Sequence, residues 1–346
     1  MDDKKYWIGF NYVKGIGSVR LSALLDYFGN LSIAWNAPSE ALVSAGLSQR
    51  IVENLQKVRS SIDLDRISDY ILEQQITVLT WNEPEYPRLL KEIDQSPPVI
   101  YVRGTITPED EWAIGIVGSR KVTSYGRQVT EELGSALAIN GITVVSGMAR
   151  GIDGIAHRAA LTAGGRTIAV LGSGVDRIYP PEHRKLAEDI IQNGAVISDY
   201  APNTPPDSLN FPPRNRIISG LSKAVIIVEA GTESGALITA SYAADQGRDV
   251  LAVPGGIYSP QSKGTNNLIQ QGARPYLGVS DILEMLNVTQ VESKKSVQTS
   301  FPTDKIELQI IKSISSEATH IDEIQRATEL PIEQVSSTLT MLELKG

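Results

Sequence analysis

The feature that most constrains the fold of this 346-residue chain is a series of short apolar runs, each followed by a glycine-rich loop. These runs lie at 113–117, 142–145, 167–171, 195–198, 224–228 and 249–253. Helical patterns separate them, among them Tyr125 to Asn140 and Asp153 to Ala163. Continuous β-branched runs that alternate with helices predict a parallel sheet covered by helices on both faces. Such a sheet binds its ligands at the carboxyl ends of the strands, where the glycine loops begin.

Changes of pattern along the chain predict an α/β protein with helical additions at both ends. Residues 1–75 have the pattern of a helical domain, and residues 76–290 that of an extended Rossmann-like domain with a doubly wound, mainly parallel sheet. Residues 291–303 are polar and without periodicity, as in a linker. Residues 304–346 show three short helical patterns and predict a partial winged-helix-like domain.

The first domain is expected to be SAM-like or helix-hairpin-helix-like. Its turn at Gly15-Ile16-Gly17 lies between two helical patterns, and bare amides in such a turn can contact a phosphate. A plain tight turn in a small helical bundle is the alternative. Residues 1–72 hold 8 Lys and Arg against 8 Asp and Glu, so the absence of a basic excess favours the plain turn.

Composition limits the kinds of function that the chain can have. The net charge is −8 and the pI about 5.1, so any nucleic-acid site must be a local basic pocket on an acidic body. Cysteine is absent, which excludes disulfides and thiolate chemistry. The sequence has neither a transmembrane run nor the apolar stretch of a signal peptide, and we expect a cytoplasmic protein with no membrane contact.

The glycine loops are candidate anion sites, because glycine lets the backbone approach an anion and helix-start amides favour negative charge. The loop at 118–126 adds Arg120, and the loop at 146–153 adds Arg150. One such loop is equally well explained as a tight turn. Several loops at one sheet edge, two of them with arginine, predict an anion site.

The segment 210–222 adds two more arginines, Arg214 and Arg216, on either side of Asn215 and directly before an apolar helical run. Arginine at a helix start opposes the helix dipole, so we interpret the pair as anion ligands. Phe211 lies close enough in sequence to stack on a base, as in single-strand binders. A core anchor for the proline loop is an equal alternative for this residue.

Patterns of catalysis and cofactor binding are missing from the sequence. There is no GxSxG elbow, no Walker pattern and no GxGxxG, so neither ATP hydrolysis nor ordinary dinucleotide binding is expected. His157 is interpreted as a hydrogen-bonded structural histidine, and Asp153 as a helix cap. Three scattered histidines without cysteine do not make a metal site, and we expect neither metal nor cofactor.

The loops together resemble the DprA/Smf family, the DNA-processing proteins of bacterial natural transformation. The resemblance rests on GSR with SYG, SGMARGIDGIAH, AVLGSGVDRIYP, FPPRNRIISGLS, SGALITA, GRDVLAVPG and GTNNLIQQGA, which span most of residues 80–286. It implies a non-catalytic protein that binds and protects incoming single-stranded DNA, forms a homodimer and loads the RecA recombinase.

The resemblance also implies which residues contact DNA and which form the dimer. The implied DNA-binding residues are Gly118, Ser119, Arg120, Gly147, Ala149, Arg150, Gly151, Arg184, Phe211, Arg214, Asn215, Arg216, Ser234 and Gly235. The implied dimer contacts are Ile282, Leu283 and Leu286, for which an ordinary amphipathic helix face is the alternative.

The chain departs from the family pattern at two places. His183 stands where the family usually has asparagine. The third region reaches Gly346 where a wing hairpin would begin, so we expect either a helical core alone or a truncated domain. Residues 304–346 carry four Lys and Arg against eight Asp and Glu, a poor match for duplex DNA, which favours a protein-contact or regulatory module.

Two other functions compete with a DNA-binding mediator. Related Rossmann-like nucleotide phosphoribohydrolases use a PGGxGTxxE arrangement, which this chain has only in split form as Gly231-Thr232-Glu233 and Pro254-Gly255-Gly256. A helix-turn-helix regulator that senses a small nucleotide is the third possibility, and the acidic third region argues against it.

Overall fold

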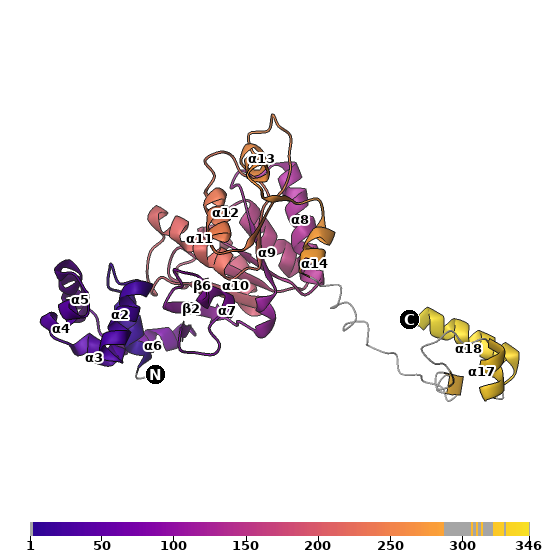
Figure 1. The fold of residues 1–346 in the computed structure, drawn as a ribbon, viewed down its shortest axis with the longest axis horizontal. Helices are drawn as coiled ribbons and strands as arrows, with labels where there is room; N and C mark the ends of the chain where they lie inside the picture. The colour runs from indigo at the N-terminus through magenta and orange to yellow at the C-terminus, as the bar shows by residue number, and fades with distance from the viewer. Residues whose placement is uncertain are drawn as a thin grey trace. The chain divides into compact units, whose positions relative to one another are not determined.

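The computed structural model describes residues 3–286, 306, 309–310, 313, 321–328 and 330–345 (Figure 1). It forms two compact units, residues 1–281 and 282–346. The first unit contains both the helical region and the α/β region. The linker predicted at 291–303 lies outside the described residues.

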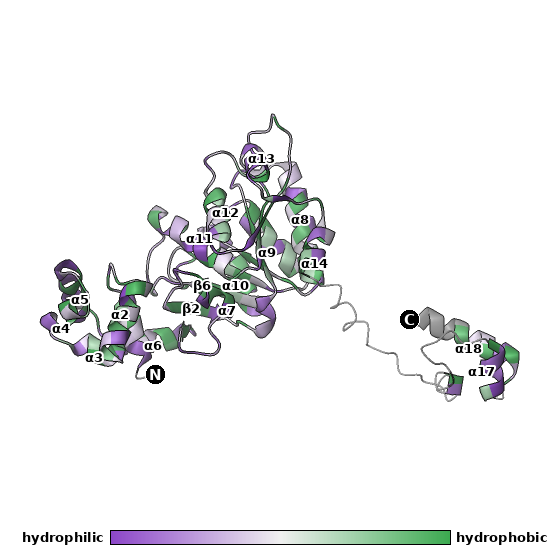
Figure 2. Cartoon of the chain, viewed as in Figure 1, coloured by the Kyte–Doolittle hydropathy of each residue, from purple (hydrophilic) through white to green (hydrophobic). Residues whose placement is uncertain are grey.

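Six short helices open the chain. They are α1 (Lys4–Asn11), α2 (Ser18–Phe28), α3 (Leu31–Asn36), α4 (Ser39–Ser44), α5 (Gln49–Ser61) and α6 (Leu64–Glu73). Their ends follow ordinary capping chemistry: Asp63 accepts the first free amides of α6, and Gly29 ends α2 with φ +71°. Most of these helices carry both hydrophilic and hydrophobic residues (Figure 2), as expected for helices that bury one face.

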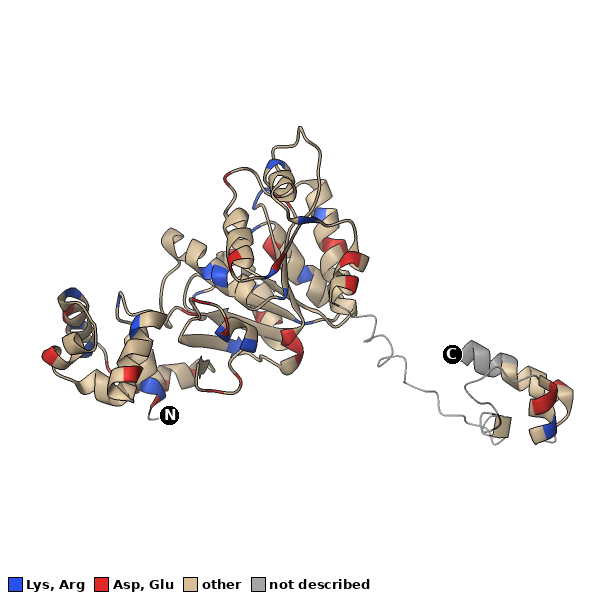
Figure 3. Cartoon of the chain, in the orientation of Figure 1, with Lys and Arg blue, Asp and Glu red and all other residues tan. Residues whose placement is uncertain are grey.

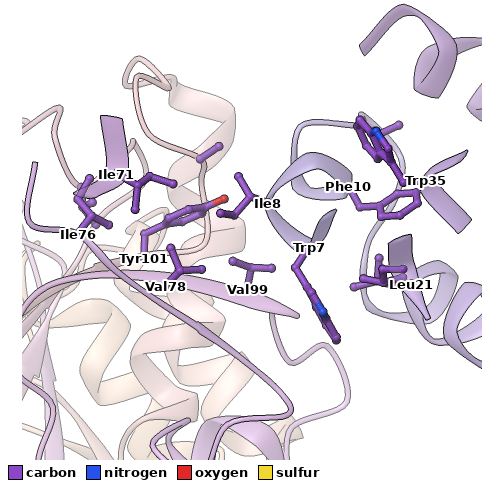
Figure 4. Close-up of a cluster of buried hydrophobic side chains, with 14 of the residues drawn as sticks. Trp7, Ile8, Phe10, Leu21, Trp35, Ile71, Ile76, Val78, Val99 and Tyr101 are labelled. Carbon is purple, nitrogen blue, oxygen red and sulfur yellow. The ribbon is translucent and has the colours of Figure 1, made fainter. Parts of the chain in front are cut away.

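The helical region shares a hydrophobic core with the edge of the sheet (Figure 4). Trp7 and Ile8 of α1 and Ile71 of α6 lie in one cluster with Val99 and Tyr101 of the second strand. Tyr101 is fully buried, and its hydroxyl donates to the Asn11 side chain at 3.1 Å. The predicted division at residue 75 therefore matches a change of secondary structure, while the two parts pack as one unit.

The sheet has nine strands in the order β1-β2-β6-β5-β4-β3-β7-β8-β9. They are β1 (Thr77–Thr80), β2 (Val99–Gly104), β3 (Ala113–Val117), β4 (Thr143–Ser146), β5 (Thr167–Val170), β6 (Gly194–Ser198), β7 (Ala224–Ile227), β8 (Asp249–Ala252) and β9 (Arg274–Pro275). β1 pairs antiparallel with β2 and β2 with β6, and all the pairs from β6 to β9 are parallel.

Helices connect and cover these strands. They are α7 (Arg88–Lys91), α8 (Ser124–Ile139), α9 (Ile152–Thr162), α10 (Arg184–Asn193), α11 (Phe211–Gly220), α12 (Gly235–Asp245), α13 (Lys263–Gln270) and α14 (Val279–Met285). The predicted Rossmann-like, mainly parallel sheet is confirmed, and each of the six predicted strands is present within one residue of its expected bounds.

The order of the strands creates a switch point between β3 and β7. From β3 the chain proceeds outward through β4, β5 and β6, and it then returns to place β7 on the other side of β3. Val117 at the end of β3 pairs with Ile227 at the end of β7. The loops that leave these two strands run in opposite directions, and a crevice opens between them at the carboxyl edge of the sheet.

In the second unit, the structure describes two helices, α17 (Ile321–Thr328) and α18 (Ile332–Lys345). Ile324 and Val335 pack with Ile310 in a small buried cluster. The second and third helical patterns predicted in this region are confirmed, and α18 begins directly after Pro331.

Candidate nucleic-acid interface

A pocket of about 1040 Å³ lies at the switch point of the sheet. Its walls come from the loops after β3, β4, β5, β6, β7 and β8 together with the starts of α11 and α12. Loops far apart in sequence meet here because all of them leave parallel strands at the same edge. The sequence predicted this edge as the ligand site, and the structure has a pocket there.

Three exposed cations line this pocket, and we call them the rim: Arg120, Lys121 and Lys263. Within the described part of the chain, no ion pair involves any of them. In the view of Figure 3, basic and acidic residues are interspersed along the ribbon. The rim is thus a local concentration of positive charge on a chain whose net charge is −8.

The sequence reasoning selected Arg120 and missed both lysines. Lys121 is the next residue in the same loop, and Lys263 begins α13 after the loop that follows β8. A lysine at the start of a helix, directly after a polar loop at the ligand edge, was the signal available in the sequence. Lys263 was overlooked because the predicted loop ended at Gly256, too early to reach it.

Two loops of the pocket touch at Gly151, where the backbone has φ +80°. A Cβ at this position would lie 2.3 Å from the carbonyl oxygen of Ser119, so only glycine fits. The Ser119 carbonyl also accepts the Ile152 amide at 3.2 Å. This contact holds the Arg120 loop against the start of α9, and it fixes the position of the rim.

Arg214 lies in the floor of the pocket and is 5% exposed. Its guanidinium donates to the carbonyl oxygens of Gly147, at 2.7 Å, and of Val170. Burial lowers the pKa of Arg214 to about 10, and the charge of Asp153 opposes that fall. Both bonds come from Nη1 and link the ends of β4 and β5, while Nε donates to the Asn215 side chain at 3.3 Å.

Asp153 fixes the same loop from its other side. Its Oδ2 accepts the amides of Gly147 at 3.1 Å and of Ala149 at 3.3 Å. Burial raises the pKa of the Asp153 carboxyl, while the Arg214 charge and the two amides oppose the rise. The expected helix cap is wrong, since Gly151 occupies the N-cap of α9. The sequence analysis predicted that the loop containing Gly147 and Ala149 contacts phosphate. The amides of these two residues already donate to the Asp153 carboxylate.

Arg216 faces away from the pocket. Helical residues two apart point about 200° from each other, so Arg214 and Arg216 on α11 cannot share one site. Arg216 pairs with Asp199 at 2.8 Å, and both side chains are largely buried. It lines a separate, smaller hollow together with Glu92 and Asp245. An acidic neighbourhood of this kind disfavours a phosphate.

The pocket gathers many of the predicted DNA-binding residues and leaves others outside. Those that line it are Gly118, Ser119, Arg120, Ala149, Phe211, Arg214, Asn215, Ser234 and Gly235. Those that do not are Gly147, Arg150, Gly151, Arg184 and Arg216. Arg150 is exposed and paired with Glu182 at 2.5 Å, and Arg184 is exposed at the start of α10.

The remaining wall of the pocket is the start of α12. Ser234 caps this helix through a bond from the Ala236 amide, and Asn215 donates to the Gly235 carbonyl at 3.2 Å. On the opposite side, the buried Glu229 accepts the amide and the hydroxyl of Thr123, the cap of α8. The start of α12 lies at the pocket, where its amides favour an anion, whereas the start of α8 is already occupied by the Glu229 carboxylate.

Two buried histidines hydrogen-bond within the α/β region, one to a strand and one to a pocket loop. His157 is fully buried with Nδ1 2.7 Å from the Thr167 hydroxyl, which confirms the predicted structural, hydrogen-bonded histidine. Burial lowers the pKa of His157 to about 3. His183, at the position where the family usually has asparagine, places Nδ1 2.8 Å from the Met148 carbonyl oxygen. It therefore helps to shape the loop after β4.

The predicted dimer contacts need a correction. Ile282, on the short helix α14, is fully buried in the single chain, and Leu286, directly after this helix, is 8% exposed. Of the three residues, only Leu283 is partly exposed. The burial of Ile282 and Leu286 within the single chain favours the alternative to a dimer contact, an ordinary packed segment.

The described residues show neither a metal cluster nor a membrane span. Among them, no group of three or more His, Asp or Glu side chains is placed to hold a metal ion. No helix in the described ranges is long and apolar enough to cross a membrane.

Two family models match the chain. The model described as DNA recombination-mediator protein A matches residues 77–287, and the DprA winged helix domain matches residues 294–346. The second match covers the predicted partial winged-helix-like domain, and it supports that prediction.

Among curated relatives, Protein Smf of Synechocystis is 36% identical over 99% of this chain and 96% of its own length. DNA processing protein DprA of Bacillus subtilis is 42% identical over 64% of this chain and 75% of its own. The X-ray structure of DprA from Streptococcus pneumoniae matches with a TM-score of 0.72 and 32% identity, over 81% of this chain and 97% of that one.

A second solved structure, DNA processing protein A of Helicobacter pylori, matches with a TM-score of 0.56 and 31% identity, over 61% of this chain and 95% of that one. That structure is described as giving insights into the single-stranded DNA binding mode of the Helicobacter pylori protein. The match to the family model covers well over half of this chain, and it coincides with the sheet and the pocket. This protein therefore belongs to the DNA recombination-mediator protein A family, the DprA/Smf proteins.

Proposed function

We propose that this protein binds single-stranded DNA by its phosphates in the switch-point pocket. The observation that carries the proposal is the rim, three exposed cations without ion-pair partners in the described residues, gathered at one pocket of an acidic chain. Arginine and lysine donate charge-assisted hydrogen bonds to phosphate, and the start of α12 adds backbone amides. The binding mode named for the Helicobacter pylori relative supports the same ligand class.

Phosphate contacts predict how such a protein discriminates between ligands. Contacts to the DNA backbone carry no base information, so affinity depends little on sequence and strongly on salt. The pocket is a crevice between loops, and a flexible single strand enters it more readily than a stiff duplex does.

Fluorescence anisotropy with a labelled oligo-dT strand and the matching duplex, across a salt series, tests this function. Single-strand binding stronger than duplex binding is expected, with a log–log salt slope of about −0.7 for each phosphate contacted. No preference for the single strand would refute the proposal.

The wider role that we propose is that of a mediator, which protects incoming single strands and loads the RecA recombinase during natural transformation or recombination. The family description as a recombination mediator supports this role. RecA filament formation on single-stranded DNA, measured with and without the protein, tests it. An unchanged rate of filament formation would count against loading.

We also propose a cytoplasmic homodimer. Because Ile282 and Leu286 are buried in the single chain, the dimer contact would use other surfaces. Light scattering of the purified chain tests the oligomeric state, and a Leu283→Arg variant that stays dimeric would place the contact elsewhere.

We propose that the protein is non-catalytic. In the split phosphoribohydrolase pattern, the backbone of Gly255 is already engaged, since the Asn266 side-chain amide bonds to both its amide and its carbonyl at 3.2 and 3.0 Å. The backbone amide of Gly255 is therefore not free to bind a nucleotide phosphate. Release of free base from a nucleoside monophosphate by the purified chain would overturn this proposal.

A further inference from the structure

Two aromatic rings lie side by side at the pocket. Tyr179 belongs to the loop after β5, and Phe211 is the first residue of α11. Their ring centroids are 5.7 Å apart, and their planes are inclined by 32°. Both side chains line the pocket, so either ring could meet a base of a bound strand.

Phe211 is enclosed by its neighbours. The Gly172 backbone lies so close that a Cβ there would approach the Phe211 ring to 2.8 Å. The guanidinium carbons of Arg120 and Arg214 lie 5.8 and 6.0 Å from the ring centroid, and Tyr179 covers a further side. Half-buried and contacted from several directions, this ring is a support for the residues around it.

Tyr179 has the freer ring of the two, with 36% of the residue exposed at the pocket. Its ring lies beside that of Phe211, with 5.7 Å between the two centroids. The Phe211 ring covers one side of the Tyr179 ring and leaves the rest of it exposed at the pocket. A preorganised aromatic surface next to cations suits a base whose phosphate binds those cations.

We propose that Tyr179 is a base-stacking subsite for single-stranded DNA, with Phe211 as its support. The inference rests on the proposed binding of single-stranded DNA at the rim. Arg120, Phe211 and Tyr179 form a continuous row of contacts, so a strand whose phosphate meets Arg120 can lay a neighbouring base on Tyr179. Stacking tolerates any base, because every base has a π-face.

The test compares two ligands that differ only in their bases: a labelled oligo-dT strand and an abasic deoxyribose-phosphate strand of the same length. For Tyr179→Leu we expect binding of oligo-dT to weaken about tenfold, since one stacked base is lost, and binding of the abasic strand to stay unchanged. Tyr179→Phe keeps the ring and should bind both strands as the wild type does. Tyr179→Trp should bind oligo-dT more tightly.

Tyr258→Leu is the matched control, because Tyr258 is 91% exposed and does not line the pocket. Both strands should bind this variant as they bind the wild type. An equal loss on both strands for Tyr179→Leu, or no loss on either, would overturn the stacking subsite while leaving phosphate binding intact. If Tyr179→Leu fails to fold, an unchanged oligo-dT affinity of Tyr179→Trp would overturn it instead. A wild type that binds neither strand would overturn the proposed function itself.

Discussion

Arg120 and Arg214 lie at nearly the same distance from the Phe211 ring, 5.8 and 6.0 Å, yet their surroundings differ. Arg120 is exposed on the rim and has no ion-pair partner among the described residues. Arg214 is buried in the floor and donates to two backbone carbonyls beside Asp153. We infer that a rim arginine binds the ligand, while the floor arginine shapes the loops around it.

The largest effect is expected for Arg214→Met, which keeps the apolar stem and removes the charge. Two buried carbonyls lose their donor, and Asp153 loses the positive charge beside it. We expect the free energy of unfolding to fall by about 3 to 5 kcal/mol, measured by urea denaturation. A loss below about 1 kcal/mol would mean that Arg214 is not a structural residue.

Arg120→Ala should have the opposite effect, a loss of DNA affinity with little change in stability. We expect single-strand affinity to weaken by about 2 kcal/mol, or roughly thirtyfold, because a charge-assisted bond to phosphate is lost. The free energy of unfolding should change by less than about 0.5 kcal/mol, since the side chain is exposed. Anisotropy and urea denaturation on the same sample separate the two effects. An intact affinity would remove Arg120 from the site.

The buried interior of the α/β region should respond to pH where the rim does not. His157 has a pKa of about 3 in the folded chain, below the usual 6.5, so the unfolded chain binds more protons. Its contribution is present above pH 6.5 and is lost as the pH falls toward 3. We expect at most about 1.4 kcal/mol of stability lost per pH unit in that window. His157→Gln, which cannot titrate, should flatten this dependence in denaturation curves recorded across the range.

The smallest effect is expected at Lys263. Because an exposed lysine contributes a weak point charge, Lys263→Ala should weaken single-strand binding by about 0.7 kcal/mol, or roughly threefold. Lys185→Ala is the matched control, since Lys185 is exposed, pairs with Asp189 and does not line the pocket. Equal losses in the two variants would indicate a general charge effect and remove Lys263 from the rim.

The sheet could be predicted because each central strand is a continuous apolar run, which leaves the sequence few other folds. The antiparallel additions β1 and β2 were not assigned, since Thr77–Thr80 is short and its pairing depends on distant contacts with the N-terminal helices. The location of the pocket followed from topology, which the alternation of strands and helices already determines.

The roles of individual arginines could not be predicted in the same way. Arg214 and Arg216 were taken as a pair because they are close in sequence, but α11 already begins at Phe211 and turns them apart. Both side chains are largely buried. Arg214 donates to the Gly147 carbonyl, and Arg216 forms an ion pair with Asp199. Residue type predicted an anion site, and only the packing showed which guanidinium lines the pocket.

The most direct test of the difference between rim and floor is the salt dependence of single-strand binding. The slope of log Kd against log salt concentration reports the number of phosphate contacts, and it does not depend on the fraction of protein that is folded. We predict that Arg120→Ala lowers the slope by about 0.7 and that Arg214→Met leaves it unchanged. A slope lowered by Arg214→Met and unchanged by Arg120→Ala would contradict the assignment of rim and floor.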